Sequence, residues 1–135
     1  MDQDIRWLQR YQQFTKSDNL LLKALAIEHP NDIERAGLIQ FFEMTLELAW
    51  KLLKDYQEAE GYTITSPRHA IKQAFQGGLI TQGHDWLQAL ADRNLTTHTY
   101  NESTARQVEK DIREKYSPFL QELNTIFLQK TQKSP

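Results

Sequence analysis

The feature that most constrains the fold is an apolar stripe within residues 31–61. Apolar or small side chains recur there at helical spacing: Leu38, Phe41, Phe42, Thr45, Ala49, Leu52, Leu53 and Tyr56. Leu46, Leu48 and Trp50 widen the apolar surface beyond one face. A single neighbouring helix covers only one stripe of its partner, so it cannot bury this surface alone. The segment therefore predicts a long helix that packs against two partners.

Residues that stop or cap helices mark the first boundaries. Pro30 ends a periodic apolar segment over residues 2–28, because proline cannot continue a helix. Asn31 and Glu34 then have the spacing of a capping box at the start of the long helix. Ser66 precedes a proline, the arrangement of a helix cap followed by the first helical residue. It predicts the start of a short third helix.

Two further helices complete the predicted fold. The fourth is expected from Asp85 to about Thr97, and the fifth begins at Asn101. Pro118 interrupts the hydrogen bonding of the fifth helix, but its apolar period continues, which predicts a kink instead of a break. No segment shows sustained strand alternation. The sequence therefore predicts one all-α domain over residues 1–135, an antiparallel up-and-down four-helix bundle with an additional short helix.

The composition limits the kinds of function. The 135 residues include no cysteine, which excludes disulfides and thiolate metal sites and favours a cytoplasmic location. The acidic start is followed by no apolar run, so no signal peptide is expected. No stretch approaches the roughly 18 apolar residues of a membrane span. The formal charge of -2 differs from the basic surface of a general nucleic-acid coat, so an RNA substrate would be bound locally.

Arg93, His98 and Tyr100 form the main candidate site. The arginine fork is always charged and suits a phosphate, the imidazole transfers protons near neutral pH, and the phenol can accept a transferred group. Asn94 and His98 are four residues apart and share a helix face, whereas Arg93 and His98 diverge by about 140° in a regular helix. The β-branched threonines among these residues favour a distorted last turn. We therefore expect Arg93 inside the helix and His98 at its frayed end.

This pattern, Arg93-x4-His98-x-Tyr100, resembles the R-x4-6-H-x-Y signature of HEPN-domain proteins, ribonuclease toxins paired with a minimal nucleotidyltransferase. Two aromatic motifs resemble the branch described as nucleotidyltransferase substrate-binding proteins. They are Arg6-Trp7 with Gln9-Arg10-Tyr11, and Phe42-Glu43 with Glu47-Leu48-Ala49-Trp50-Lys51. The likeness covers nearly the whole chain.

The resemblance implies the toxin of a type VII-like toxin–antitoxin pair, a metal-independent endoribonuclease acting on tRNA or mRNA. In a homodimer, two copies of His98 would divide the acid and base roles, Arg93 would stabilise the developing charge, and Asn94 would orient the imidazole or bind the phosphate. The implied partner is a minimal nucleotidyltransferase antitoxin, in a heterotetramer or a larger complex. It would silence the toxin by transferring AMP to Tyr100. No cofactor and no metal are expected in the chain itself.

Several alternatives stay open at this stage. The chain could be a non-catalytic substrate-binding subunit of a two-component nucleotidyltransferase, with Arg93 a surface charge and His98 a capping residue. Glu43 and Glu47 could form a carboxylate metal pair, although an ion pair between Glu47 and Lys51 is favoured by their spacing.

Aromatic and histidine side chains elsewhere give weaker candidates. Trp7, Trp50 and Trp86 are interpreted as core or interface residues in preference to base-stacking platforms. His69 follows Arg68 at a predicted helix start, where free N–H groups can bind a phosphate, but nothing else indicates a site there.

Overall fold

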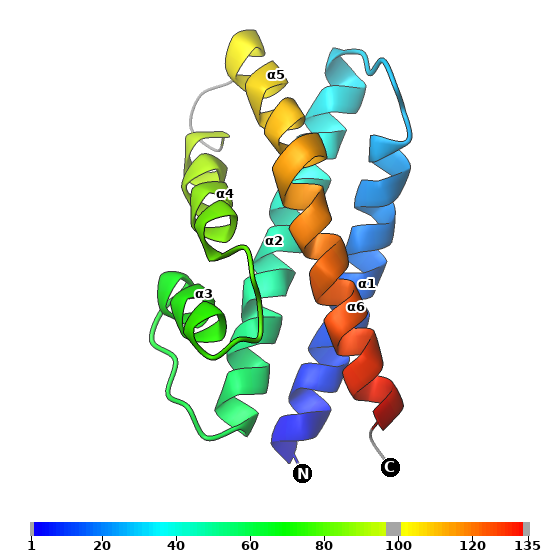
Figure 1. The fold of residues 1–135 in the computed structure, drawn as a ribbon. Helices are drawn as coiled ribbons and strands as arrows, with labels where there is room; N and C mark the ends of the chain where they lie inside the picture. The colour runs from blue at the N-terminus through cyan, green and yellow to red at the C-terminus, as the bar shows by residue number, and fades with distance from the viewer. Residues whose placement is uncertain (1, 97–100, 134–135) are drawn as a thin grey trace.

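The computed structural model describes residues 2–96 and 101–133, and all its regular elements are helices (Figure 1). The elements are α1 (Asp2–Leu25), α2 (Asp32–Ala59), α3 (Pro67–Gln76), α4 (Gly83–Thr96), α5 (Glu102–Asp111) and α6 (Ser117–Lys133). A π-helical turn, Ile112–Tyr116, joins α5 and α6 into one continuous helix. The described residues contain no strand, so the predicted all-α class with five helices is confirmed. None of these helices is long and apolar enough to cross a membrane.

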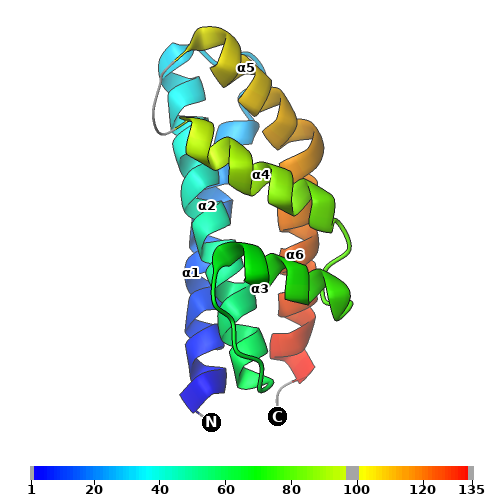
Figure 2. The ribbon, with the colours of Figure 1, turned by 90° about the vertical axis from the view of Figure 1, so that its left-hand side faces the viewer.

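Three long helices form the body of the molecule. Helices α1, α2 and the continuous α5–α6 helix run side by side, and α1 begins at the end of the molecule where α6 finishes (Figure 1). The short helices α3 and α4 lie across the same side of this group, one above the other (Figure 2). Helix α3 packs on α2, while α4 packs on α3, on α5 and on the π turn. The two-sided packing predicted for α2 is therefore confirmed.

The core follows the apolar stripe of α2. The predicted stripe residues are buried at Leu38, Phe42, Thr45, Ala49, Leu52 and Leu53, and partly buried at Phe41 and Tyr56. Aromatic rings from the other helices complete the core. Trp86 of α4 stacks on Phe119 of α6 with ring centroids 4.3 Å apart, and Trp7 of α1 meets Phe127 of α6 edge-on at 5.6 Å. Such aromatic pairs contribute about 0.5–1.5 kcal/mol beyond their buried area.

The predicted caps are present. Asn31 and Glu34 form a complete capping box, with reciprocal bonds of 2.8 and 2.9 Å. Ser66 accepts a hydrogen bond from the backbone of α3, and Asn101 accepts two at the start of α5. These caps satisfy N–H groups that a helix leaves without internal partners.

Helix α1 ends at Leu25, earlier than predicted, for a tertiary reason. Arg113 donates hydrogen bonds of 2.8 and 2.9 Å to the carbonyl oxygens of Leu25 and Ile27. These two carbonyl oxygens therefore already have a hydrogen-bond donor. They do not need the backbone N–H that a continuing helix would supply four residues later. The sequence of α1 does not contain this information, because the donor is on another helix.

The helix around Pro118 continues through a π turn. The N–H of Ser117 donates to the carbonyl of Ile112, the fifth residue before it, instead of the fourth. A proline lacks an N–H, so the wider turn shifts the bonding pattern just before Pro118. Figure 2 shows α5 leaning away from the line of α6. The interruption predicted at Pro118 is thus absorbed within one bent helix.

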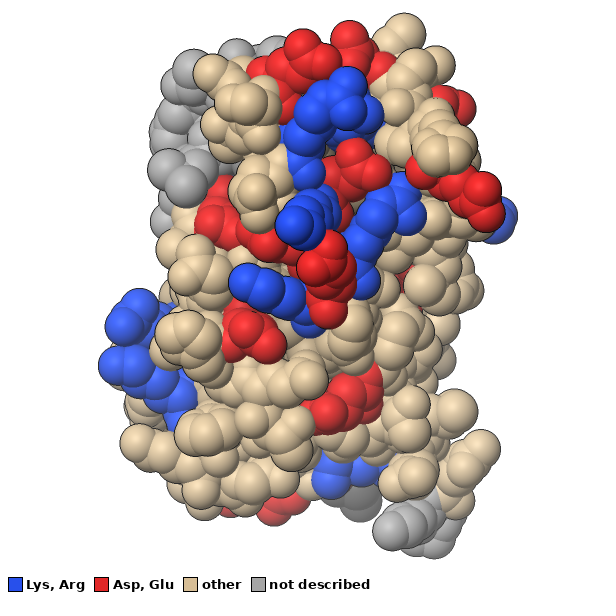
Figure 3. Space-filling model, turned by 45° about the horizontal axis from the view of Figure 1, so that its top comes forward, with Lys and Arg blue, Asp and Glu red and all other residues tan. Residues whose placement is uncertain are grey.

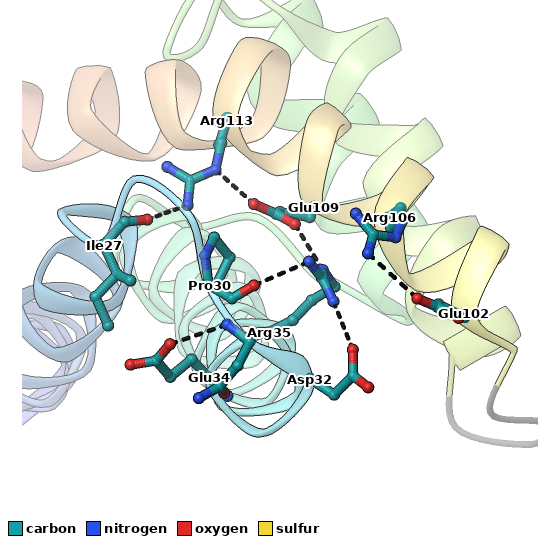
Figure 4. A network of polar contacts seen from close by, with 10 residues as sticks. Ile27, Pro30, Asp32, Glu34, Arg35, Glu102, Arg106, Glu109 and Arg113 are labelled. Carbon is teal, nitrogen blue, oxygen red and sulfur yellow. Dashed lines mark hydrogen bonds and ion pairs between the residues drawn. The ribbon is translucent and has the colours of Figure 1, made fainter.

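A buried arginine connects three segments at one end of the molecule (Figure 4). Arg35 of α2 is 4% exposed and binds Glu109 of α5 at 2.8 Å, Asp32 at 3.1 Å and the carbonyl of Pro30 at 3.1 Å. Glu109 also accepts from Arg113 at 2.9 Å. The network places one carboxylate between two guanidinium groups and holds the connection between α1 and α2 against α5.

Removing the charge of Glu109 should destabilise the fold. We expect Glu109→Gln to lower the free energy of unfolding by about 2 kcal/mol, because it weakens charge-assisted bonds to Arg35 and Arg113. Urea unfolding of both proteins measures the difference. Glu102→Gln is the matched control, since the Glu102–Arg106 pair is exposed, and it should cost below about 0.5 kcal/mol. Equal losses in the two variants would contradict the buried-network interpretation.

The same contribution should depend on pH. Burial alone raises the pKa of Glu109, but the hydrogen bonds and charges of Arg35 and Arg113 outweigh it and lower the pKa below its ordinary value of 4.5. A carboxyl with a lowered folded pKa contributes stability above its unfolded pKa and loses it as the pH falls through the folded value. The stability difference between wild type and Glu109→Gln should therefore shrink below about pH 4.5.

Candidate functional site

Arg93 lies in the last turn of α4, inside the helix as predicted. Its side chain is 23% exposed and one guanidinium nitrogen is 2.5 Å from a carboxylate oxygen of Glu47 on α2. This short, charge-assisted contact joins two helices that are far apart in the sequence. It directs the guanidinium toward α2 and keeps part of its surface open to solvent.

Glu47 is the centre of a small polar cluster on α2. The same oxygen that meets Arg93 accepts a hydrogen bond of 3.0 Å from the indole nitrogen of Trp50. The other oxygen is 3.5 Å from the ammonium of Lys51, so the predicted Glu47–Lys51 ion pair is confirmed. Glu47 therefore balances two cations in the structure. The described residues contain no group of three or more histidine, aspartate or glutamate side chains placed to hold a metal.

The residue before Arg93 anchors α4 from its buried side. Asp92 is 8% exposed and accepts a hydrogen bond from the hydroxyl of Tyr116, which lies in the π turn and is fully buried. Gln88 donates a second bond to Asp92 at 3.2 Å. Burial, the hydrogen bond to Asp92 and nearby carboxylates raise the pKa of the Tyr116 hydroxyl, so it stays protonated and keeps donating. This contact positions the last turn of α4 and with it Arg93.

A hollow of about 290 Å³ lies between the end of α4 and α5. Its lining consists of Asp92, Ser103, Thr104, Gln107, Val108 and Asp111. Among the described residues, this lining includes two carboxylates and no cation, which disfavours a phosphate there.

The other predicted site residues fall in the part of the chain that is not described. Asn94 belongs to the last turn of α4, but its side chain is outside the described set. His98 and Tyr100 lie outside the described residues. Asn101, the next described residue, caps α5 as predicted. The structure thus fixes Arg93 on one side of the motif and the helix start on the other.

The remaining candidates have structural roles. Trp7 and Trp86 are buried core residues, as predicted, and Trp50 is half-buried beside Glu47. The ring Nδ1 of His69 accepts a hydrogen bond of 3.1 Å from the backbone of Thr65, so it stabilises the start of α3. Sequence reasoning missed two contributors to the Arg93 site, the Glu47–Arg93 pair and the Asp92 anchor. The spacing of Glu47 and Trp50, one helical turn, indicates only the hydrogen bond between those two residues, so neither contributor has a local signal in the sequence.

Surface charges of the described residues are mixed in sign. On the face shown in Figure 3, acidic and basic side chains are interleaved and form no continuous basic stripe. Several cations of the described residues have carboxylate neighbours, as in the Arg35, Arg106 and Arg113 pairs. A nucleic acid bound along such a face would meet repulsion as well as attraction.

Comparisons with known proteins agree with this architecture. Residues 9–129 match the family described as "Nucleotidyltransferase substrate binding protein like". The crystal structure of a protein from Thermus thermophilus superposes with a TM-score of 0.76 at 34% sequence identity, covering 82% of this chain and 94% of that one. No curated protein matches the sequence. The family match covers most of the chain, and the fold is all-helical. The chain therefore belongs to the nucleotidyltransferase substrate-binding-like family.

Tyr116 should be needed to hold the site. We expect Tyr116→Phe to lower the free energy of unfolding by about 1–3 kcal/mol, because it leaves the buried Asp92 carboxylate short of a donor. Chemical denaturation measures this loss. Tyr62→Phe serves as the control, since that tyrosine is half exposed and its hydroxyl has no buried partner to abandon. An unchanged stability in Tyr116→Phe would contradict the anchoring role.

Proposed function

We propose that this chain is a metal-independent endoribonuclease, the toxin of a pair in which a nucleotidyltransferase is the antitoxin. The observation that carries the proposal is the position of Arg93, half-buried in the last turn of α4 and held by a carboxylate on α2. This arginine is the first residue of the Arg93-x4-His98-x-Tyr100 pattern. Membership in the nucleotidyltransferase substrate-binding-like family supports a partner of that class.

Arg93 suits a phosphate because its present partner is an oxyanion of similar shape. The Glu47 carboxylate presents one oxygen to the guanidinium, and a phosphate oxygen can replace it. Glu47 remains paired with Trp50 and Lys51 after such an exchange. The charge of Arg93 would then stabilise the phosphorane that forms during cleavage.

Two copies of the motif would form the complete site in a homodimer. One His98, as the neutral imidazole, takes the proton of the ribose 2′-hydroxyl. The 2′-oxygen attacks the phosphorus at the same time. The other His98, protonated, gives a proton to the 5′-oxygen as its bond to phosphorus breaks. One imidazole cannot easily serve both sides of an in-line displacement, whereas two symmetry-related ones can. Asn94, one turn before His98, would orient the imidazole or bind the phosphate.

Tyr100 would be the control point. A phenol with a pKa near 10 is a poor nucleophile at neutral pH, so its modification requires an enzyme that supplies a base and ATP. The partner nucleotidyltransferase would transfer AMP to the Tyr100 oxygen and release pyrophosphate. An attached AMP adds bulk and negative charge near Arg93, which repels an RNA phosphate. The partner and toxin would assemble as a heterotetramer or a larger complex.

Loss of either motif residue should abolish most cleavage. We expect Arg93→Ala to reduce the rate by on the order of 10²-fold, the usual effect of removing one group that stabilises transition-state charge. His98→Ala should reduce it by about 10²- to 10⁴-fold, as for general acid–base catalysis. RNA cleavage by the purified chain in EDTA measures both, and products should carry a 2′,3′-cyclic phosphate.

Arg106→Ala is the matched control for this experiment, because Arg106 is an exposed arginine with a carboxylate partner on α5. Its cleavage rate should equal that of wild type. Light scattering should show a dimer for all these proteins. Activity that disappears with EDTA, or an active monomer, would refute the metal-free composite site. A chain without any cleavage activity, bound tightly to its nucleotidyltransferase, would favour the non-catalytic substrate-binding role.

Co-expression with the partner should modify Tyr100 and silence the chain. Intact-mass spectrometry should show one or more added AMP units, with RNA cleavage lost and the helical content unchanged. Tyr100→Phe should stay unmodified and remain toxic beside the partner, because the phenol oxygen is the acceptor and is not used in cleavage. His98→Ala keeps this oxygen and should still gain AMP. An unmodified wild-type mass in an inactive complex would indicate inhibition by sequestration.

A further inference from the structure

A pocket of about 400 Å³ lies at the other end of the molecule from the Arg93 site. It is formed where α2, α3 and α6 end, and it is lined by Tyr56, Gln57, Glu60, Tyr62, Gln73, Gly77, Gly78, Leu79 and Lys130. Its volume lies within the roughly 300–1,000 Å³ range of small-molecule sites. Two aromatic rings, two amides, a cation and a carboxylate converge on it. Neither the Arg93 site nor the proposed RNA cleavage uses these groups.

Lys130 and Tyr56 together provide an anion-binding corner. The Lys130 ammonium is 3.0 Å from the Tyr56 hydroxyl oxygen and 4.6 Å from the centre of that ring. No carboxylate of the described residues pairs with Lys130. The tyrosine oxygen accepts from Lys130, so the tyrosine O–H hydrogen is left to donate to a ligand. Two adjacent donors, one of them charged, suit the oxygens of a phosphate.

Gln57 offers a hydrogen-bond acceptor inside the pocket. The residue is 5% exposed, and both amide hydrogens are used, on the carbonyls of Leu53 at 3.1 Å and Ala70 at 3.0 Å. No described residue donates to its oxygen, and no fully buried side-chain oxygen of the described residues lacks a partner. The Gln57 oxygen therefore opens into the pocket, where it can accept from an N–H group of a ligand.

The rim of the pocket supplies a stacking surface. Gly61 has a φ of 101°, a conformation that favours glycine, and the chain reverses there so that the Tyr62 N–H bonds the Gln57 carbonyl at 3.0 Å. This turn places Tyr62 at the pocket with half of its surface exposed. Such a ring can stack on a planar base. The nearby Glu60 carboxylate is of the type that accepts hydrogen bonds from ribose hydroxyls.

We propose that this pocket binds a nucleoside monophosphate, with its phosphate at Lys130 and Tyr56 and its base between Tyr62 and Gln57. The arrangement offers a donor pair for the phosphate, a carboxylate for the ribose, and a ring and an amide oxygen for the base. The site is separate from the Arg93 motif and does not depend on RNA cleavage. The pocket recognises the phosphate, the ribose and the base of its ligand together.

Calorimetric titration of the full chain with AMP tests the proposal, with inorganic phosphate and adenosine as separate arms. AMP should bind with one site per chain. Inorganic phosphate and adenosine should each bind at least ten-fold more weakly than AMP. Lys130→Gln and Tyr62→Ala should each weaken AMP binding by about ten-fold, the effect of losing a charge-assisted contact or a stacked base. Lys16→Gln, an exposed lysine of α1 away from the pocket, should leave it unchanged.

Three outcomes would overturn the proposal. They are the absence of saturation at millimolar AMP, phosphate binding as tight as AMP binding, and an unchanged affinity in both Lys130→Gln and Tyr62→Ala. Tyr62 is exposed, so its substitution keeps the test valid even where a change at Lys130 disturbs the end of α6. Circular dichroism of each variant verifies that the helices are intact.

Discussion

Helix α2 has to bury apolar side chains over more of its circumference than one neighbour can cover, and the other helices are arranged around this requirement. Helix α1 packs along one side of α2, α5–α6 along another, and the short helix α3 against its C-terminal half, while α4 lies on α3 and the π turn. Because α2 is central, a charged residue on it can reach several elements. Arg35, near one end of α2, binds Glu109 of α5. Glu47, near the middle of α2, binds Arg93 of α4. The polar contacts that define the candidate site therefore depend on the packing of α2.

The arginine of the candidate site is positioned by contacts on both sides of α4. Asp92 holds the helix to the π turn through Tyr116, and Glu47 holds the guanidinium to α2. Adjacent residues of a helix point about 100° apart, so one can be buried while the next reaches a partner at the surface. This arrangement holds the charged group in one position and leaves part of it exposed to solvent.

Most of the fold is predictable from local signals. The capping box at Asn31, the Ser66 cap and the apolar stripe of α2 each depend on residues a few positions apart, and all are confirmed. The early end of α1 and the Glu47–Arg93 pair depend on residues that are distant in the sequence. The arginines are visible in the sequence, but their partners are not, since many backbone carbonyls and carboxylates are available to each guanidinium. His98 and Tyr100 remain predictions, because they lie outside the described residues.

The π turn before Pro118 also sets the rotation of one half of its helix relative to the other. A π turn contains one residue more than an α-turn, and each residue rotates the chain by about 100°. Without the extra residue, Ala105 and Val108, which α5 now buries, would turn away from the core, while the side chains of α6 stayed in place. The cap of α5 at Asn101 would rotate with them. The direction in which Asn101 and the first turn of α5 face is therefore determined by a single inserted residue well downstream in the sequence.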